Sequence, residues 1–139
     1  MLQERCVARG WRPSFEPTIA RDRADICMQA IGQPLTGLFH PGDDGRLAEA
    51  AGRYADGLVI AGMGGGHVPP AAAVVLAELA RRMLVVLASR CAAWPVLTST
   101  YRGVGAESDL IAQGLLPVGN LQPLKARLRL VVGLSLIHI

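Results

Sequence analysis

The sequence predicts a small α/β domain, a three-layer Rossmann-like or flavodoxin-like arrangement with about four parallel strands. Three observations lead to this prediction. From residue 34 onward, short apolar runs alternate with helical patterns, which is typical of a parallel sheet. The run at 57–61 has no polar alternation, as expected for a strand that is covered on both faces. Hydrophobic residues make up 51% of the 139 residues, which is enough for one sizeable core.

The first elements follow from the spacing of apolar residues. Residues 35–39 form an apolar run that ends at a Pro-Gly-Asp turn, which predicts a strand. The next segment has apolar residues at helical spacing, so it predicts a helix with one buried face. The residues of that face are Leu47, Ala50, Ala51 and Tyr54. The run at 57–61 is then the second strand, and a glycine loop follows it.

The second half continues the alternation. A Pro-Pro pair suits the first turn of a helix after the glycine loop. Its predicted buried stripe consists of Val75, Leu76, Leu79, Ala80 and Met83. Residues 84–88 predict a third strand and 115–118 a fourth, with a short helix between them. The last helix begins near residue 120, and its predicted buried face consists of Leu121, Leu124, Leu128 and Val131.

Composition excludes several classes of protein. The net charge is only +3 and aromatic residues make up 4%, so neither a basic patch nor a stacking platform for nucleic acid is expected. The longest uncharged stretch, 57–77, is interrupted by glycines and a proline pair, which argues against a membrane span. The three cysteines are widely spaced and form no Cys-x-x-Cys pair, so we expect no metal site and a reducing, cytoplasmic location.

A glycine-rich loop, Gly62-Met-Gly-Gly-Gly-His67, lies where α/β folds bind ligands, between a strand and a helix. A dinucleotide fingerprint would need glycine at position 67 and an acidic residue after the next strand, where Ser89 and Arg90 stand. No Gly-Lys-Ser/Thr segment occurs. We therefore expect no nucleotide cofactor. Two interpretations stay open, namely a tight turn that only needs glycine and a loop that faces a substrate.

Three polar residues near the predicted loops are candidates for a site. His67 is either a hydrogen-bonded structural group or a side chain that faces a ligand. Glu107 and Asp109 lie near a predicted helix start, where capping is one role and ligand contact is another. A triad of Ser89, His67 and Asp109 can be drawn, but no Gly-x-Ser-x-Gly segment supports it.

Five segments occur in a characteristic order, namely 56–69, 85–90, 100–101, 105–110 and 119–127. Over roughly residues 35–134, this series resembles the C-terminal domain of the bacterial L-asparaginase/glutaminase family. The resemblance implies hydrolysis of the side-chain amide of L-asparagine, with L-glutamine as the alternative substrate, to the acid and ammonia. It implies a threonine nucleophile that forms an acyl-enzyme, and no metal and no cofactor.

In that family the nucleophile belongs to a Thr-Gly-Gly-Thr segment of a larger N-terminal domain. The threonines of this chain are Thr18, Thr36, Thr98 and Thr100, and none has that context. We therefore expect no catalytic residue in this chain and no activity of the chain alone.

The resemblance also implies two substrate-binding residues that act in trans, at the site of a neighbouring subunit. Glu107 would be the counter-charge of the substrate's α-amino end and His67 a hydrogen-bonding group. The supporting loop residues would be Gly62, Gly64, Gly65 and Gly66. The complete protein would be a homodimer or homotetramer, and this chain would bind the substrate only together with the missing N-terminal domain.

The sequence also suggests limits for this domain. Residues 1–33 have no regular pattern and predict a linker or an unplaced remnant, whereas 34–134 form the recognisable domain. Residues 135–139 depart from the alanine, glycine and arginine bias, and one back-translation resembles a sequencing adapter, so we expect a non-native tail. The alternatives to an asparaginase fragment are a freestanding module that binds a small ligand and an oligomerisation module, both without catalysis.

Overall fold

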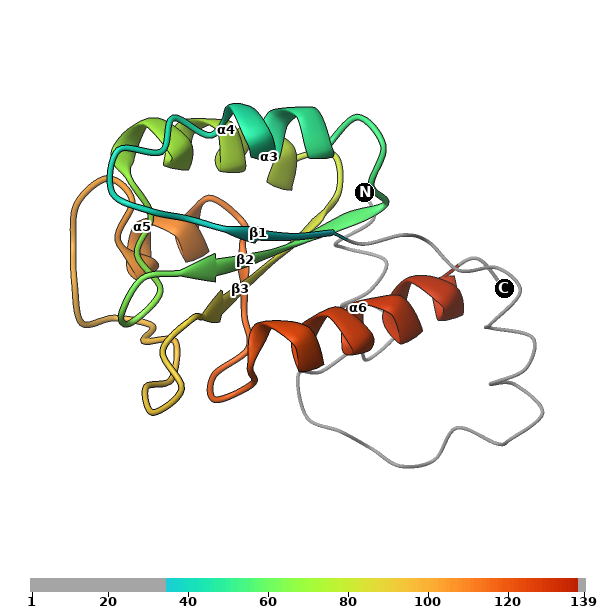
Figure 1. The fold of residues 1–139 in the computed structure, drawn as a ribbon. Coiled ribbons are helices and arrows are strands. Elements are labelled where there is room, and N and C mark those ends of the chain that lie inside the picture. Colours follow the sequence, from blue (N-terminus) through green and yellow to red (C-terminus); the bar gives the residue numbers. More distant parts are fainter. Residues whose placement is uncertain (1–34, 138–139) are drawn as a thin grey trace.

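The computed structural model describes residues 35–137 (Figure 1). The predicted linker at 1–33 lies outside this range, and so do the last two residues of the predicted tail. The elements, in chain order, are β1 (Leu35–Leu38), α3 (Arg46–Ala51), β2 (Gly57–Gly62), α4 (Pro70–Ala80), β3 (Leu84–Ser89), α5 (Glu107–Ala112), β4 (Leu116–Pro117) and α6 (Pro123–Ile137).

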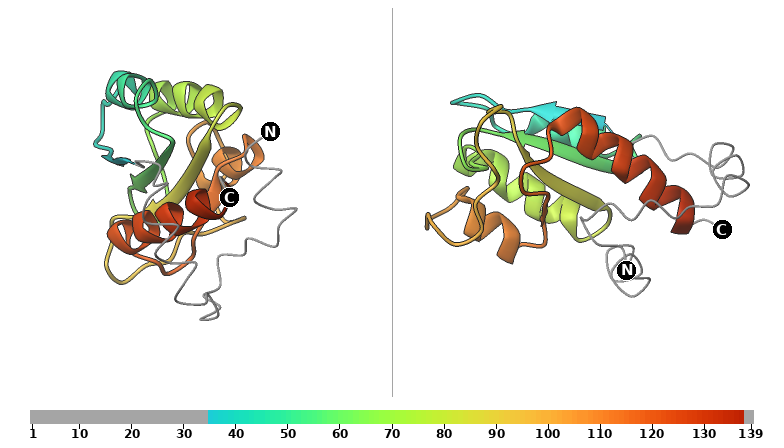
Figure 2. Two further views of the ribbon diagram at one scale, coloured as in Figure 1. Left: turned by 90° about the vertical axis from the view of Figure 1, so that its right-hand side faces the viewer. Right: turned by 90° about the horizontal axis from the view of Figure 1, so that it is seen from below.

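The four strands form one parallel sheet in the order β1-β2-β3-β4, which confirms the predicted α/β class. Crossovers between parallel strands are almost always right-handed, so strands added in one direction carry their connecting helices to one face. Accordingly α3, α4 and α5 cover one face of the sheet, and among the described helices α6 covers the other (Figures 1 and 2). The result is three layers.

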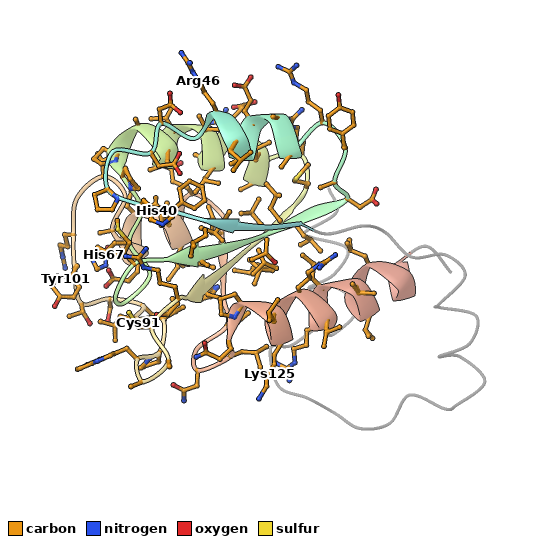
Figure 3. The ribbon with its side chains drawn as sticks, in the orientation of Figure 1. His40, Arg46, His67, Cys91, Tyr101 and Lys125 are labelled. Carbon is orange, nitrogen blue, oxygen red and sulfur yellow. The ribbon has the colours of Figure 1, made fainter. Side chains whose placement is uncertain are left out.

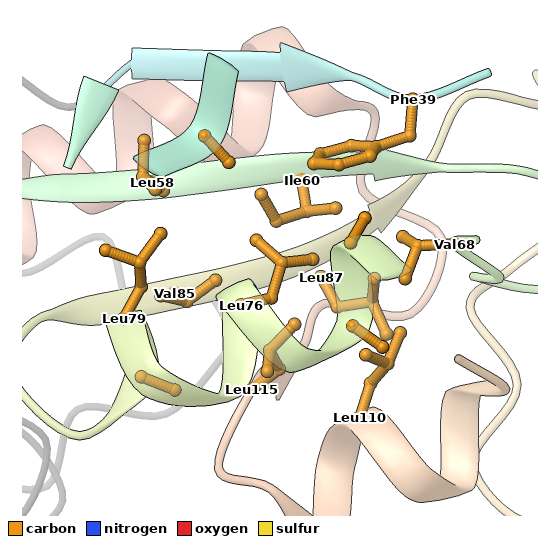
Figure 4. Close-up of a cluster of buried hydrophobic side chains, with 14 of the residues drawn as sticks. Phe39, Leu58, Ile60, Val68, Leu76, Leu79, Val85, Leu87, Leu110 and Leu115 are labelled. Carbon is orange, nitrogen blue, oxygen red and sulfur yellow. The ribbon is translucent and has the colours of Figure 1, made fainter. Parts of the chain in front are cut away.

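Alternate residues of the central strands supply the two cores. Leu58 and Ile60 of β2 pack under α3 and α4 in the larger cluster (Figure 4). Val59 of β2 and Val86 of β3 point to the opposite face, where α6 covers them. Because both faces are buried, β2 and β3 are buried at every position, as the unbroken apolar runs indicate.

The predicted buried face of α3 is wrong except at Ala51, which packs against the core. Leu47 and Tyr54 are exposed, at 71% and 84%, whereas the smaller Ala48 and Gly52 are buried. The reason is the close approach of α3 to α4, since a Cβ on Gly52 would lie only 2.4 Å from Cδ2 of Leu79. Small residues therefore face the neighbouring helix, and the larger apolar side chains face outward.

The predicted face of α6 is also wrong, although Leu121, which precedes the helix, packs against the core. Leu124 and Leu128 are exposed, at 72% and 67%, whereas Ala126, Leu130 and Leu134 are buried against the sheet. The predicted set is spaced by three or four residues and the buried set by four, and both spacings keep side chains on one helix face, so the spacing alone does not distinguish them. Within residues 35–137, every helix, α6 included, falls short of the length and apolar character that a membrane crossing requires.

Candidate functional site

The candidate site lies at the carboxyl ends of β2 and β3, the two central strands of the sheet. The turn after β2, the long segment after β3 and the first residue of α5 meet there (Figure 3). The described strands follow the chain order without a reversal, so this sheet lacks the switch-point crevice in which many α/β folds bind ligands. A ligand site at this end of the sheet must therefore be formed by the loops that follow the strands.

The glycine turn after β2 folds back on itself. The N–H of Met63 donates to the carbonyl oxygen of His67 at 2.8 Å, and the N–H of His67 returns a 2.8 Å bond to Met63. Gly64 and Gly66 have φ values of 51° and 114°, which favour glycine. A Cβ on Gly62 would lie 2.9 Å from the carbonyl carbon of Gly66. The glycines thus permit a compact reversal that ends at His67.

Neighbouring segments hold the turn in place. The hydroxyl of Ser89, the last residue of β3, donates to the carbonyl oxygen of Gly64 at 2.6 Å. The N–H of Leu97 donates to the carbonyl oxygen of Gly65 at 2.8 Å. These two carbonyl groups are therefore bonded to the protein, and the bonds hold the turn that ends at His67.

Glu107, the first residue of α5, is fully buried. Its Oε1 accepts the N–H of Thr100 at 2.8 Å and the N–H of Tyr101 at 2.7 Å. The hydroxyl of Ser108 donates to the carbonyl oxygen of Tyr101. Hydrogen bonds to an ionised acceptor are stronger than neutral ones, so the carboxylate anchors this part of the loop firmly.

The second carboxylate oxygen of Glu107, Oε2, has no hydrogen-bond partner, and it is the one buried polar side-chain atom of the described residues in that condition. Nε2 of His67 lies 3.6 Å away, which is too long for a hydrogen bond. The His67 ring packs edge-on against Tyr101, with centroids 4.9 Å apart. The structure thus brings together His67 and Glu107, which are far apart in the sequence.

The protonation of Glu107 is set by opposing effects. Burial raises the pKa of the carboxyl group, because it disfavours the charged form. The backbone N–H groups of Tyr101, of Glu107 itself and of Thr100, together with the neighbouring His67, lower the pKa by more. The pKa of Glu107 therefore lies below its usual value, and the buried group is a carboxylate at neutral pH.

Other polar residues near the turn do not assemble around His67. Besides its bond to the turn, the Oγ of Ser89 accepts the N–H of Cys91 at 3.0 Å, and Oδ2 of Asp109 accepts the N–H of Gly105 at 3.0 Å. Both side chains thus bind backbone, so the conceivable triad is not formed. No three His, Cys, Asp or Glu residues between positions 35 and 137 are grouped so that they could hold a metal ion.

Sequence reasoning missed the backbone partners of the site. The N–H groups of Thr100 and Tyr101 carry no signal, because every residue except proline has one. The role of Ser89 had a signal, namely a single hydroxyl at the end of an apolar strand that lies beside the glycine turn. The conceivable triad gives Ser89 the role of a nucleophile, whereas in the structure its hydroxyl bonds to the turn.

Comparisons with known proteins agree with the fold. The family model described as the glutaminase/asparaginase C-terminal domain matches residues 38–137. A probable L-asparaginase of Deinococcus radiodurans is 35% identical over 125 residues, which cover 90% of this chain and 35% of the relative. The crystal structure of a probable cytoplasmic L-asparaginase from Campylobacter jejuni matches with a TM-score of 0.64 and 29% identity, over 76% of this chain and 31% of that chain. The chain thus spans about a third of the length of either relative.

Proposed function

The chain belongs to the glutaminase/asparaginase family as its C-terminal domain, and on this premise we propose that it is one part of an L-asparaginase-like amidohydrolase. The complete protein converts L-asparagine and water to L-aspartate and ammonia. This chain contains no threonine in the context of a nucleophile, so it contributes binding groups and is inactive alone.

The observation that carries the proposal is the unpaired oxygen of Glu107. A buried carboxylate oxygen without a partner is unfavourable, and a donor of opposite charge removes that penalty. The α-ammonium group of an amino acid is such a donor, because it combines a positive charge with three N–H groups. Glu107 therefore binds the α-ammonium group of the substrate as its counter-charge, and His67 contacts the same group.

The site is completed by a partner subunit in a homodimer or homotetramer, which acts in the cytoplasm. Exposed apolar side chains near the site support this part of the proposal. Trp94, Tyr101 and Val104 are all more than half exposed, in the loop that leads to α5. Such side chains are typical of a surface that another domain covers. The same observation favours the second candidate function, an oligomerisation module without catalysis.

The two candidates differ in what the site binds. We expect L-asparagine to shift the amide resonances of Thr100 and Tyr101, because both N–H groups donate to the Glu107 carboxylate. Succinamic acid, which lacks only the α-amino group, should leave them in place. The measurement is a two-dimensional NMR titration of the 139-residue chain together with the N-terminal domain that completes the site, and the chain without that domain should not respond.

Variants make the test specific. Glu107→Gln should abolish the response to L-asparagine, whereas Glu49→Gln, at an exposed glutamate of α3, should retain it. Responses to succinamic acid and L-asparagine of equal size would exclude recognition of the ammonium group. The chain alone should release no ammonia from L-asparagine, and measurable release would refute the claim that it has no nucleophile.

A further inference from the structure

Gly105 links the two segments that form the candidate site. It lies two positions before Glu107, and its carbonyl oxygen accepts the N–H of Val68 at 3.0 Å. Val68 directly follows His67 in the chain. This backbone hydrogen bond therefore ties the end of the glycine turn to the start of α5, next to both side chains of the proposed ammonium site.

The link requires an unusual backbone conformation at Gly105. Its φ is 84°, and a Cβ at this position would clash with the carbonyl oxygen of Val68. Glycine adopts many conformations at little cost, so its neighbours have to select this one. Oδ2 of Asp109 does so, because it accepts the N–H of Gly105 at 3.0 Å. Gly105 is thus held through its N–H by α5 and through its carbonyl group by Val68.

We propose that Asp109 is a positioning residue of the ammonium site, because it fixes Gly105 and thereby the separation of His67 from Glu107. The proposal rests on the proposed function of Glu107. Nε2 of His67 and Oε2 of Glu107 are 3.6 Å apart, a separation at which one small group can contact both side chains. A displacement of either segment breaks one of these contacts. Asp109 acts on this geometry through the backbone, since its Oδ2 is engaged by Gly105.

Helix capping is the alternative role for Asp109. A carboxylate in the first turn stabilises a helix by its charge, and Asp109 lies in the first turn of α5. Capping of this kind depends on the charge, whereas positioning depends on the place of one acceptor oxygen. Two substitutions separate the roles. Asp109→Asn keeps an acceptor oxygen at the same distance from the backbone and removes the charge, whereas Asp109→Glu keeps the charge and moves the oxygen by one methylene group.

The first measurement uses the 139-residue chain without ligand. The rings of His67 and Tyr101 pack edge-on with centroids 4.9 Å apart, so their protons should show a nuclear Overhauser effect. The N–H of Tyr101 donates to the Glu107 carboxylate, so this effect reports how the two segments lie relative to each other. Asp109→Asn should retain the effect and the amide resonance of Val68. Asp109→Glu should weaken the effect and shift that resonance.

Asp43→Glu is the matched control. Oδ1 of Asp43 accepts the N–H of Gly45 at 3.0 Å, and Gly45 has a φ of 83°, so the same substitution is made beside a glycine of the same kind. This pair lies just before α3, in a segment that carries no residue of the candidate site. Asp43→Glu should therefore leave the effect between His67 and Tyr101 and the resonance of Val68 unchanged.

The second measurement uses the complete protein, in which the N-terminal domain completes the site. Asp109→Glu should raise the KM for L-asparagine roughly tenfold and leave kcat nearly unchanged, because a displaced binding group weakens the ground state and the transition state alike. Asp109→Asn should keep the KM of the wild type. A capping role alone predicts a wild-type KM for both variants and a lower thermal stability for Asp109→Asn.

The outcomes for Asp109 and for the proposed function are distinguishable. A wild-type nuclear Overhauser effect and KM in Asp109→Glu, or loss of both in Asp109→Asn, would overturn the positioning role and leave the ammonium site in place. A complete wild-type protein without activity on L-asparagine would instead overturn the proposed function. The comparison in the chain without ligand would then still decide whether Asp109 sets the position of His67.

Discussion

Gly66 connects the glycine turn to the buried carboxylate at the level of single atoms. A Cβ at this position would lie 3.1 Å from Cγ1 of Val96, 3.3 Å from Cδ2 of Leu87 and 3.6 Å from Cβ of Glu107. The backbone also has a φ of 114°, which side-chain-bearing residues rarely adopt. The absence of a side chain at Gly66 therefore lets the turn pack directly against the residue that we propose as the ligand.

Gly66→Ala separates packing from backbone strain when it is compared with Gly103→Ala. Gly103 has a φ of 116°, but no atom lies within 4 Å of its Cβ position. Both variants should lose roughly 1–3 kcal/mol of unfolding free energy from backbone strain. Gly66→Ala should lose about 1–3 kcal/mol more, because its methyl group overpacks the core. Urea unfolding measures both, and equal losses would mean that the contacts around Gly66 adapt without cost.

At the residue scale, the sequence predicted only part of the site. The pairing of His67 with Glu107 came from the family resemblance, since spacing and composition left capping and structural roles open for both. The anchoring of Glu107 by two backbone N–H groups was beyond the reach of the sequence, because such groups do not depend on side-chain identity. The lack of a hydrogen-bond partner for Oε2 of Glu107 likewise depends on how the folded chain packs, so the sequence does not predict it.

At the scale of elements, the sequence predicted where the helices and strands lie, but it did not predict which faces of α3 and α6 are buried. Each helix carries apolar residues on more than one side, and on α3 the larger ones predict the wrong buried face. Close contact with α4 instead requires small residues there, because Gly52 lies directly against Leu79. On α6, the buried stripe passes over β2, where Gly57 leaves room for Leu130 and Leu134.

Two leucines of α6, two positions apart, test the corrected face. Leu130→Ala should cost about 2–5 kcal/mol of unfolding free energy, because it removes a fully buried side chain from the core. Leu128→Ala should change it by no more than about 0.5 kcal/mol, since Leu128 lies on the exposed face. Chemical unfolding of the 139-residue chain provides both values. If Leu128→Ala has the larger effect, the face that carries Leu128 is the buried one.

At the scale of the whole molecule, the two cores share one sheet. Successive residues of β2 point alternately into the larger cluster and into the α6 cluster, so neither side can lose its packing without disturbing the same backbone. The candidate site belongs to the side of the larger cluster, through Glu107 at the start of α5. Its stability should therefore depend on packing beneath the opposite face of the sheet.

Hydrogen exchange in the Leu130→Ala variant tests this dependence. Leu130 belongs to the α6 cluster, yet the amides of α4, such as that of Leu79, should exchange faster by the same factor as those of Val59 and Val86 in β2 and β3. Under conditions in which exchange follows the opening equilibrium, that factor is about tenfold for each 1.4 kcal/mol lost. Leu128→Ala should leave all these rates unchanged. Faster exchange of Val59 and Val86 with no change in α4 would mean that the two layers open independently, and that the site does not depend on α6.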